Sequence, residues 1–343
     1  MTIPVFDGHN DVVLRLDEGD RNFVEESSEG HLDLPRARRG GFAGGLFAIF
    51  VSGPEDGDMG GKPTGPYSFP LAPSIAPEVA VARADHLEEI LRGVEADGAI
   101  RFVTSAAQIE ECFADGTIAA VLHLEGAEPI LSPDDLERRY DRGLRSLGLV
   151  WSRANRYAEG VPFRFPASPD TGPGLSEEGR HLVRACNRLG ILVDLSHLNM
   201  RGFFDVAELS ESPLVASHSN AHAVCPSTRN LTDEQLDTIS GSGGLVGVNF
   251  AVGFLREDGL LEPESTPLDT VVRHIDYLVD RMGIDCVGLG SDYEGAAPPA
   301  ELSDVTRLPA LFDALRERGY DQEALAKIAH ANWIRVLRDT WGE

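Results

Sequence analysis

Eight apolar runs recur along the 343-residue chain, and segments with helical patterns separate most of them. Several runs, such as GILVDLS and GLVGVNF, are almost continuously apolar, which is typical of parallel strands buried on both faces. Eight strand–helix repeats over this length predict a (β/α)8 TIM-type barrel, and we expect a single barrel domain over residues 1–343. A doubly wound open sheet is the alternative. The expected strands lie near residues 4–11, 42–51, 119–125, 144–151, 190–196, 213–218, 244–250 and 285–291.

The segments between these runs carry ordinary helix start and stop signals. Ser105 to Gln108 and Thr232 to Gln235 both fit a capping box. Ser132 is followed by a proline and two acids, which suits a capped helix start. Glycines follow several helical stretches, where a left-handed cap would lie.

Six residues of metal-ligand type close five of the eight expected strands. The carboxyl ends of barrel strands converge on one face, where such folds build their active sites. Histidine together with carboxylate is a ligand set that holds zinc with a position left open for water. A doubly wound sheet would not bring these ends to one point. The residues are His9, Asp11, Glu125, His197, His218 and Asp292.

His9 and Asp11 form an HxD pattern at the first strand end. Side chains two apart on a strand face the same way, so both could bind one ion. His197 and His218 close consecutive strands, which favours a shared ion. His123 also lies on a strand, and we interpret it as a possible support for the site and not as a ligand.

A site for two metal ions needs a bridging group, which in many barrel hydrolases is a carboxylated lysine. The chain has two lysines: Lys62 lies in a Gly/Pro-rich loop and Lys327 in the final helix, so neither closes a strand. The bridge must then be a true carboxylate, and Glu125 is in the right place. The alternative for Glu125 is an acid that caps the following helix.

Asp292 and Arg229 are candidates for roles other than metal binding. An acid facing a metal-activated water can accept its proton and donate it to a leaving amine, which suits Asp292. The alternative is a turn-forming aspartate. A cationic fork beside a metal site suits a substrate carboxylate, which favours Arg229. Its alternative is a surface arginine paired with Asp233.

Two Gly/Pro-rich segments interrupt the strand–helix alternation. Residues 53–73 follow the second expected strand, and residues 155–174 follow the fourth. Both are long for connections without regular structure, so we expect them to cover the barrel mouth and shape the substrate pocket. The alternative is that they are tolerated surface insertions.

Composition excludes several classes of function. A formal net charge of −26 would repel phosphate backbones, which argues against nucleic-acid binding. No apolar run of membrane-spanning length is present, and the first residues lack a signal-peptide pattern. The four cysteines show no CxxC spacing, which favours reduced thiols. We therefore expect a cytoplasmic protein with no membrane association.

Five motifs, in their order along the chain, resemble the membrane (renal) dipeptidase family of binuclear zinc peptidases. They are the HxD pattern, HLEGAEPI, VDLSHLN, SHSNAHAV with STRNLTD, and GLGSDYEG, and the resemblance runs from residue 5 to about residue 338. It implies a (β/α)8 fold and hydrolysis of dipeptides, often with a D-residue at the C-terminal position. It also implies a homodimer.

By the same resemblance, two zinc ions are expected in each chain. His9 and Asp11 would hold one ion, His197 and His218 the other, and Glu125 would bridge them.

The resemblance also implies roles for the residues that are not ligands. A hydroxide bridging the ions would attack the peptide carbonyl, while Asp292 would act as general acid and base. Arg229 would meet the C-terminal carboxylate of the substrate.

The chain departs from the family pattern after the fourth strand. Many members have a Leu-Thr-His run there, whose histidine assists at the scissile carbonyl, but this chain has Leu149, Val150 and Trp151. An indole N–H can donate one hydrogen bond but carries no charge. Trp151 is therefore expected to contact substrate, and Arg153 or Arg156 could supply the missing charge.

Two further functions stay open from the sequence. One is a binuclear metal hydrolase that acts on another small amide, an N-acyl amino acid or a lactone. The other is a metal-binding scaffold without catalysis, although such a scaffold would not need Asp292.

Overall fold

The protein is described here from a computed structural model, which describes residues 2–19, 21–53 and 65–343. In this part of the chain eight parallel strands close a barrel in the order β1-β2-β5-β6-β8-β9-β10-β11, with β11 paired to β1. The predicted (β/α)8 barrel and its eight strands are confirmed. The barrel strands are β1 (Val5–Asn10), β2 (Phe42–Phe50), β5 (Ile118–Glu125), β6 (Leu144–Gly148), β8 (Leu192–Asp194), β9 (Val215–Ser219), β10 (Leu245–Val248) and β11 (Val287–Leu289).

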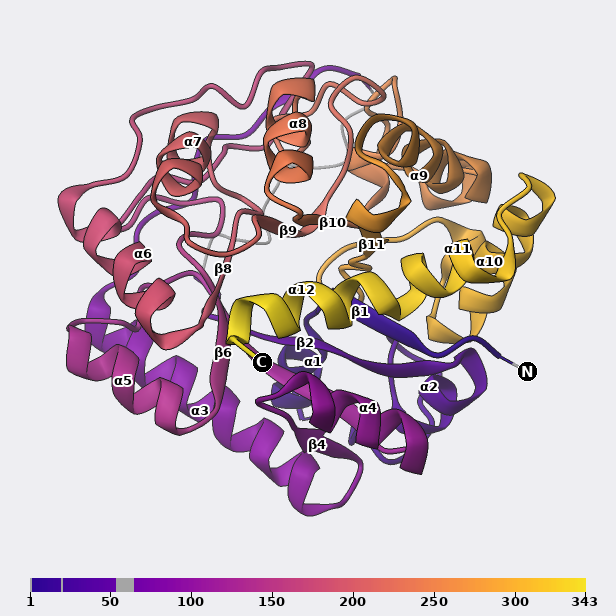
Figure 1. Cartoon of the computed structure of the whole chain (residues 1–343), viewed down its shortest axis with the longest axis horizontal. Coiled ribbons are helices and arrows are strands. Elements are labelled where there is room, and N and C mark those ends of the chain that lie inside the picture. The colour runs from indigo at the N-terminus through magenta and orange to yellow at the C-terminus, as the bar shows by residue number, and fades with distance from the viewer. Residues whose placement is uncertain (1, 20, 54–64) are drawn as a thin grey trace.

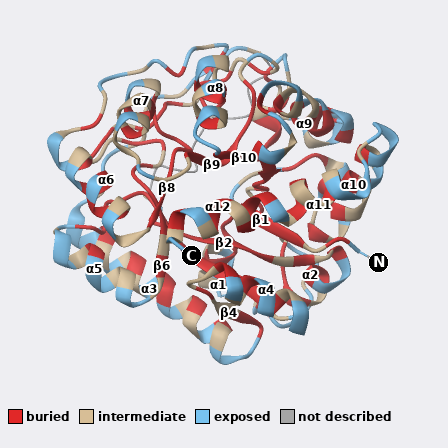
Figure 2. Cartoon of the chain, in the orientation of Figure 1, coloured by how far each residue is buried: buried red, intermediate tan, exposed pale blue. Residues whose placement is uncertain are grey.

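Most of the helices surround the barrel (Figure 1), and their buried sides face the strands (Figure 2). They are α1 (Val12–Asp17), α2 (Leu34–Gly40), α3 (Pro77–Ala96), α4 (Ala106–Asp115), α5 (Pro133–Asp141), α6 (Glu177–Leu189), α7 (Met200–Leu209), α8 (Asp233–Gly241), α9 (Leu268–Met282), α10 (Leu308–Glu317), α11 (Gln322–Ala326) and α12 (Asn332–Trp341). Short helical turns cover Val252–Phe254, Pro263–Ser265, Ile284–Cys286, Ala300–Leu302, Val305–Arg307 and Lys327–Ala331.

Most of the expected helix caps are present. Ser132 caps α5, and Thr232 forms a complete capping box with Gln235 at the start of α8. Ser105 caps α4, but Oε1 of Gln108 accepts from the backbone N–H of Thr104 and not from that of Ser105 as predicted. The box predicted at α4 is therefore only half formed.

Helix α12 closes the N-terminal end of the barrel, which it crosses in Figure 1. Its Trp333 is fully buried, packs against Phe6 of β1 with ring centroids 5.9 Å apart, and donates from Nε1 to the carbonyl of Leu289. An ideal Cβ on Gly8 would lie 2.4 Å from the Trp333 ring and 2.3 Å from the Ser217 carbonyl oxygen. Because α12 and Trp333 fill this end of the barrel, a cavity can form only at the opposite end, where the strands have their carboxyl ends.

The two Gly/Pro-rich segments pair with each other at that opposite end. Strand β3 (Tyr67–Ser68) runs antiparallel to β7 (Arg164–Phe165), and Tyr67 and Phe163 both line the cavity described below. Residues 54–64, including Lys62, lie outside the described residues. For the described parts, the expectation that these segments shape the pocket is met. Like β3 and β7, the short strand β4 (Ile100–Phe102) was not expected; it pairs with the start of β5 outside the barrel.

Within the described residues, no helix has both the length and the apolar character needed to cross a membrane. All four cysteines are buried and unpaired to one another, as their spacing indicated.

Candidate metal centre

The six predicted residues of metal-ligand type converge at the carboxyl ends of the barrel strands. His9 lies on β1, Asp11 lies between β1 and α1, Glu125 ends β5 and His218 lies on β9. The remaining two, His197 and Asp292, each lie three residues beyond their strands, β8 and β11. All six are buried or nearly so.

The Glu125 carboxylate lies among the three imidazoles. Its Oε1 is 3.2 Å from Nε2 of His197 and 3.6 Å from Nε2 of His218, while its Oε2 is 3.6 Å from Nε2 of His9. Nε2 of His9 is also 3.2 Å from Oδ2 of Asp11, as the HxD spacing predicted. Glu125 is not a helix cap, since the next helix, α5, begins eight residues later with its own cap.

The donor atoms of this cluster fit metal ions better than they fit one another. Nε2 of His197 and Nε2 of His218 face each other at 3.0 Å. A pair of neutral ring nitrogens in that position shares at most one proton. Nδ1 of His9 and Oδ1 of Asp11 are buried and have no hydrogen-bond partner among the described residues. Two groups, His9 with Glu125 and His218, and His9 with Asp11 and Asp292, bring ligand atoms within 4.8 Å of one another.

Burial and mutual charge shift the pKa values of these residues strongly. Burial raises the pKa of Glu125 to about 8. Burial also lowers the pKa values of His197 and His218 well below the ordinary value. Burial would lower the pKa of His9, but the charges of Glu125 and Asp11 outweigh it and raise the pKa to about 10. The His197 and His218 rings are therefore neutral, as metal binding requires, whereas His9 and Glu125 would release their protons when a divalent cation binds.

Asp292 is held by backbone and side-chain contacts at the end of β11. Its Oδ2 accepts a hydrogen bond from Nδ2 of Asn249 over 2.9 Å, and its backbone N–H donates to the carbonyl of His9. Burial raises the pKa of the Asp292 carboxyl. Asp292 has φ 61° and His197 has φ 66°, a left-handed conformation that costs free energy in non-glycine residues and tends to cluster at functional sites.

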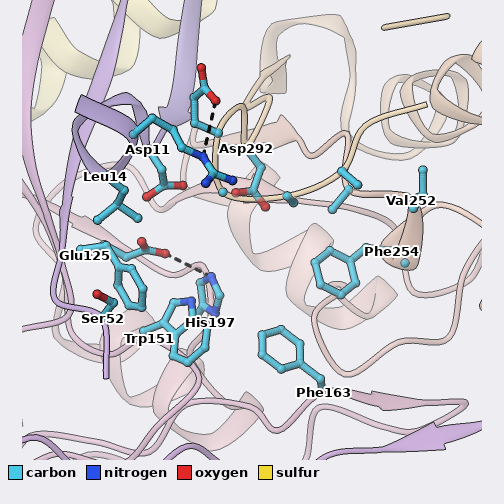
Figure 3. A pocket seen from close by; sticks show the side chains of 18 of the residues that line it. Asp11, Leu14, Ser52, Glu125, Trp151, Phe163, His197, Val252, Phe254 and Asp292 are labelled. Carbon is cyan, nitrogen blue, oxygen red and sulfur yellow. Dashed lines mark ion pairs between the residues drawn. The ribbon is translucent and has the colours of Figure 1, made fainter. Parts of the chain in front are cut away.

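A cavity of about 670 Å³ opens beside this cluster. Glu125, His197, Asp11 and Asp292 line it together with an aromatic wall (Figure 3). The wall runs from Phe50 through Trp151 and Phe163 to Phe254, with successive ring centroids 5.0, 5.6 and 6.0 Å apart. Such a volume with a few polar groups suits a small ligand.

The two predicted substrate contacts lie in different surroundings. Trp151 lines the cavity, with its ring centroid 5.8 Å from that of His197. Arg229 does not line the cavity; it is buried, and its guanidinium carbon lies 5.3 Å from the ring centroid of Phe254. Its Nη2 donates to the carbonyl of His218, and its Nε has no hydrogen-bond partner among the described residues. The surface alternative is wrong, because Asp233 pairs with Arg281 instead.

The two other arginines considered for the carbonyl do not line the cavity. Arg153 is buried with its guanidinium 5.1 Å from the Trp151 ring centroid, and Arg156 donates to the carbonyl of Leu131. His222 does not line the cavity either; its Nε2 donates to the Ala167 carbonyl.

Two supporting residues were missed by the sequence reasoning. Asn249 follows β10 directly, and a strand-end position was the available signal. Glu294 is buried beyond Asp292, where its Oε1 accepts from Arg21 and from the backbone N–H groups of His31 and Leu32. Glu294 therefore fixes the loop after α1 against the end of β11, a long-range contact with no local sequence signature.

Comparison with known proteins agrees with this geometry. The model of the membrane dipeptidase family, peptidase family M19, matches residues 1–341. A metallopeptidase from Rhodobacter sphaeroides, whose crystal structure contains a phosphinate mimic of the dipeptide L-Ala-D-Ala, is 51% identical; the match covers 99% of this chain and 100% of that one, with a TM-score of 0.93. An uncharacterized protein of Klebsiella pneumoniae, from the region 5′ of pqqA, is 51% identical over 71% of this chain and 90% of its own length. An uncharacterized dipeptidase of Schizosaccharomyces pombe is 31% identical over 98% of this chain and 81% of its own. The chain therefore belongs to the membrane dipeptidase family, peptidase family M19.

Proposed function

We propose that this chain is a dipeptidase that uses two zinc ions held within one barrel domain. The observation that carries the proposal is the position of Glu125, whose two oxygens face the Nε2 atoms of His9, His197 and His218. One carboxylate between three imidazoles, with Asp11 beside His9, is the arrangement that a bridged pair of ions requires. The metallopeptidase relatives support the same conclusion.

In this proposal His9 and Asp11 would hold one ion, His197 and His218 would hold the other, and Glu125 would be shared between them. When bound, two zinc ions supply Lewis-acid activation of water and of a carbonyl oxygen. Zinc is preferred because imidazole with carboxylate is its usual ligand set in hydrolytic sites. A homodimer and a cytoplasmic location stay predictions.

Asp292 is proposed to transfer a proton from the attacking water to the leaving amine. Its carboxylate lies on the cavity surface, close to His9 and Asp11, and its Oδ2 is oriented by Asn249. From there it accepts the proton of the attacking water and delivers it to the nitrogen of the leaving amine. Burial, which raises its pKa, brings this carboxyl closer to the neutral range in which such a transfer works best.

The substrate is a free dipeptide small enough for the cavity of about 670 Å³. The aromatic wall excludes water on one side, and Trp151 contacts the substrate near His197. The C-terminal carboxylate is assigned to Arg229, which does not line the cavity itself but whose buried Nε has no hydrogen-bond partner among the described residues. The L-Ala-D-Ala mimic bound by the Rhodobacter relative supports acceptance of a D-residue at the C-terminal position.

Hydrolysis of a panel of L,L- and L,D-dipeptides by the zinc-loaded protein tests the proposal, with N-acetylated dipeptides as controls. We expect cleavage of the free dipeptides only, at a stoichiometry of two zinc ions per chain. Two bound ions without cleavage of any dipeptide would contradict it and would direct the search to other amides and lactones.

A further inference from the structure

Two buried aspartates, neither of them a candidate ligand, form the same contact between neighbouring strands. Asp194 ends β8 and accepts from Ser217 of β9 twice: from its backbone N–H at Oδ1 over 2.7 Å and from its Oγ at Oδ2 over 2.5 Å. Asp7 of β1 accepts from the backbone N–H and Oγ of Ser291, which follows β11, both over 2.7 Å. In each pair the serine lies two residues beyond the strand partner of the aspartate, and a candidate site residue follows it directly.

The Asp194 pair continues to a ring nitrogen. Oγ of Ser217 lies 2.8 Å from Nδ1 of His218. A serine hydroxyl has one proton, and here a carboxylate, which can only accept, takes it. Oγ must therefore accept from His218, so that Nδ1 carries the ring proton. The lone pair of Nε2 is then left to face Glu125 and His197.

We propose that Asp194 is a positioning residue that fixes the tautomer of His218, and thereby makes its Nε2 a metal ligand. This inference rests on the proposed metal centre. The three residues are Asp194, Ser217 and His218, each at most 2% exposed, so water does not compete for the hydrogen bonds. Partners of this kind set both the ring orientation and the tautomer of metal-binding histidines.

The isosteric variant Asp194→Asn tests the direction of the protons. Oδ1 of Asp194 accepts from two backbone N–H groups, those of Ser196 and Ser217, so the amide oxygen of asparagine must take that position. Its NH2 group then donates to Ser217 Oγ, whose own proton turns toward Nδ1 of His218. The His218 ring then adopts the tautomer with its proton on Nε2, and this nitrogen can no longer bind metal. We expect zinc affinity to fall by about tenfold to a hundredfold.

A second variant separates this effect from loss of packing. Ser217→Ala removes the hydroxyl that links Asp194 to His218 but keeps the hydrogen bond from the backbone N–H of residue 217 to Asp194. His218 then loses its partner at Nδ1 but is not forced into the opposite tautomer. We expect Ser217→Ala to weaken zinc binding less than Asp194→Asn does. The variant with both changes should bind zinc about as well as Ser217→Ala alone. Without the Ser217 hydroxyl, the asparagine at position 194 cannot change the tautomer of His218. A merely structural Asp194 would make the double variant the weakest of the three.

Asp7→Asn is the matched control. Oγ of Ser291 donates to Asp7 and accepts from the backbone N–H of Tyr293, so no ring tautomer depends on it. We expect its zinc affinity to stay within about threefold of the wild type.

The measurements are zinc affinity by chelator competition and the nitrogen chemical shifts of His218 in the metal-free protein. The wild type should show the Nδ1–H tautomer, and Asp194→Asn should show the Nε2–H tautomer. An unchanged tautomer, or equal losses of zinc affinity in Asp194→Asn and Asp7→Asn, would overturn the inference. A wild-type protein that binds no zinc would instead count against the proposed function.

Discussion

Asn249 and Asp292, which follow the neighbouring strands β10 and β11, are joined by a hydrogen bond of 2.9 Å from Nδ2 to Oδ2. Burial raises the pKa of Asp292, and this bond opposes the rise because it favours the charged carboxylate. Replacing Asn249 by Ala removes the opposing effect. We expect the acidic limb of the kcat/KM profile to move to higher pH, since the carboxylate must be ionised to accept a proton. Dipeptide hydrolysis between pH 5 and pH 8 measures this, and an unmoved limb would contradict it.

Asp292→Asn should separate metal binding from proton transfer. The amide keeps the shape of the side chain but cannot accept and return a proton. Loss of a general acid–base group typically lowers turnover by about 10²- to 10⁴-fold. We expect kcat to fall by this amount while two zinc ions stay bound, as measured by metal analysis of the purified variant. Asp313→Asn, a change at an exposed aspartate paired with Arg316, is the control and should leave kcat unchanged. Full activity in Asp292→Asn would remove Asp292 from the mechanism.

The barrel and the main cluster could be predicted because both depend on local patterns. Buried parallel strands are apolar throughout, so a polar residue of ligand type stands out where such a run ends. Glu125 is the clearest case, since every residue of β5 is buried and the strand ends on a carboxylate. The short strand β4 escaped notice because three residues give too little periodicity to separate from a helix end.

The supporting contacts could not be predicted because they join residues far apart in the sequence. Asp7 and Ser291 are separated by 284 positions, and only closure of the barrel brings them together. The burial of Arg229 could not be predicted either. Its contact with Phe254 depends on how two loops fold against each other. A capping pattern such as Ser105 to Gln108 predicted the helix start but not which backbone N–H the glutamine would reach.

Two glycine substitutions should affect different properties, one metal binding and the other the stability of the fold. An ideal Cβ on Gly295 would lie 2.1 Å from Oδ2 of Asp11 and 2.6 Å from Oδ1 of Asp292, both of which are ends of side chains that can move. Gly295→Ala should therefore fold, with metal affinity and turnover both reduced. A Cβ on Gly8 would meet the backbone oxygen of Ser217 at 2.3 Å and the ring of Trp333. Gly8→Ala should lose about 1–3 kcal/mol or more of unfolding free energy.

Urea denaturation and metal analysis of both variants distinguish these outcomes. A Gly295→Ala protein with wild-type metal affinity would show that Asp11 and Asp292 need not hold their present positions.

Removal of metal should destabilise the fold. Ions that bind only the folded state add unfolding free energy, about 2.7 kcal/mol when free zinc is a hundredfold above its dissociation constant. Without them, the facing Nε2 atoms of His197 and His218 and the buried Glu125 carboxylate lose their common partner. We expect a chelator to lower the melting temperature and added zinc to restore it. Glu125→Gln should show a smaller response to zinc, and an equal response would argue against Glu125 as the bridge.

A buried histidine away from the metal centre should make stability depend on pH. His274 of α9 accepts at Nδ1 from the backbone N–H of Ala221 and donates from Nε2 to the carbonyl of Leu255, so it must be neutral in the folded protein. Burial lowers its pKa from 6.5 to about 4. The unfolded chain therefore binds the extra proton more readily. The contribution of the neutral His274 ring to the free energy of unfolding is fully present above pH 6.5. It is lost as the pH falls from 6.5 toward 4, by up to about 3 kcal/mol in all.

His274→Gln can keep both hydrogen bonds without titrating, because a glutamine side chain offers one acceptor and one donor group. Between pH 7.5 and pH 5 we expect the metal-free wild type to lose about 2 kcal/mol more unfolding free energy than this variant. Urea denaturation at several pH values, with a chelator present, gives the two slopes. His181→Gln, a change at an exposed histidine of α6, should keep the wild-type slope. Equal slopes for the wild type and His274→Gln would mean that the hydrogen bonds to Ala221 and Leu255 do not hold this ring neutral.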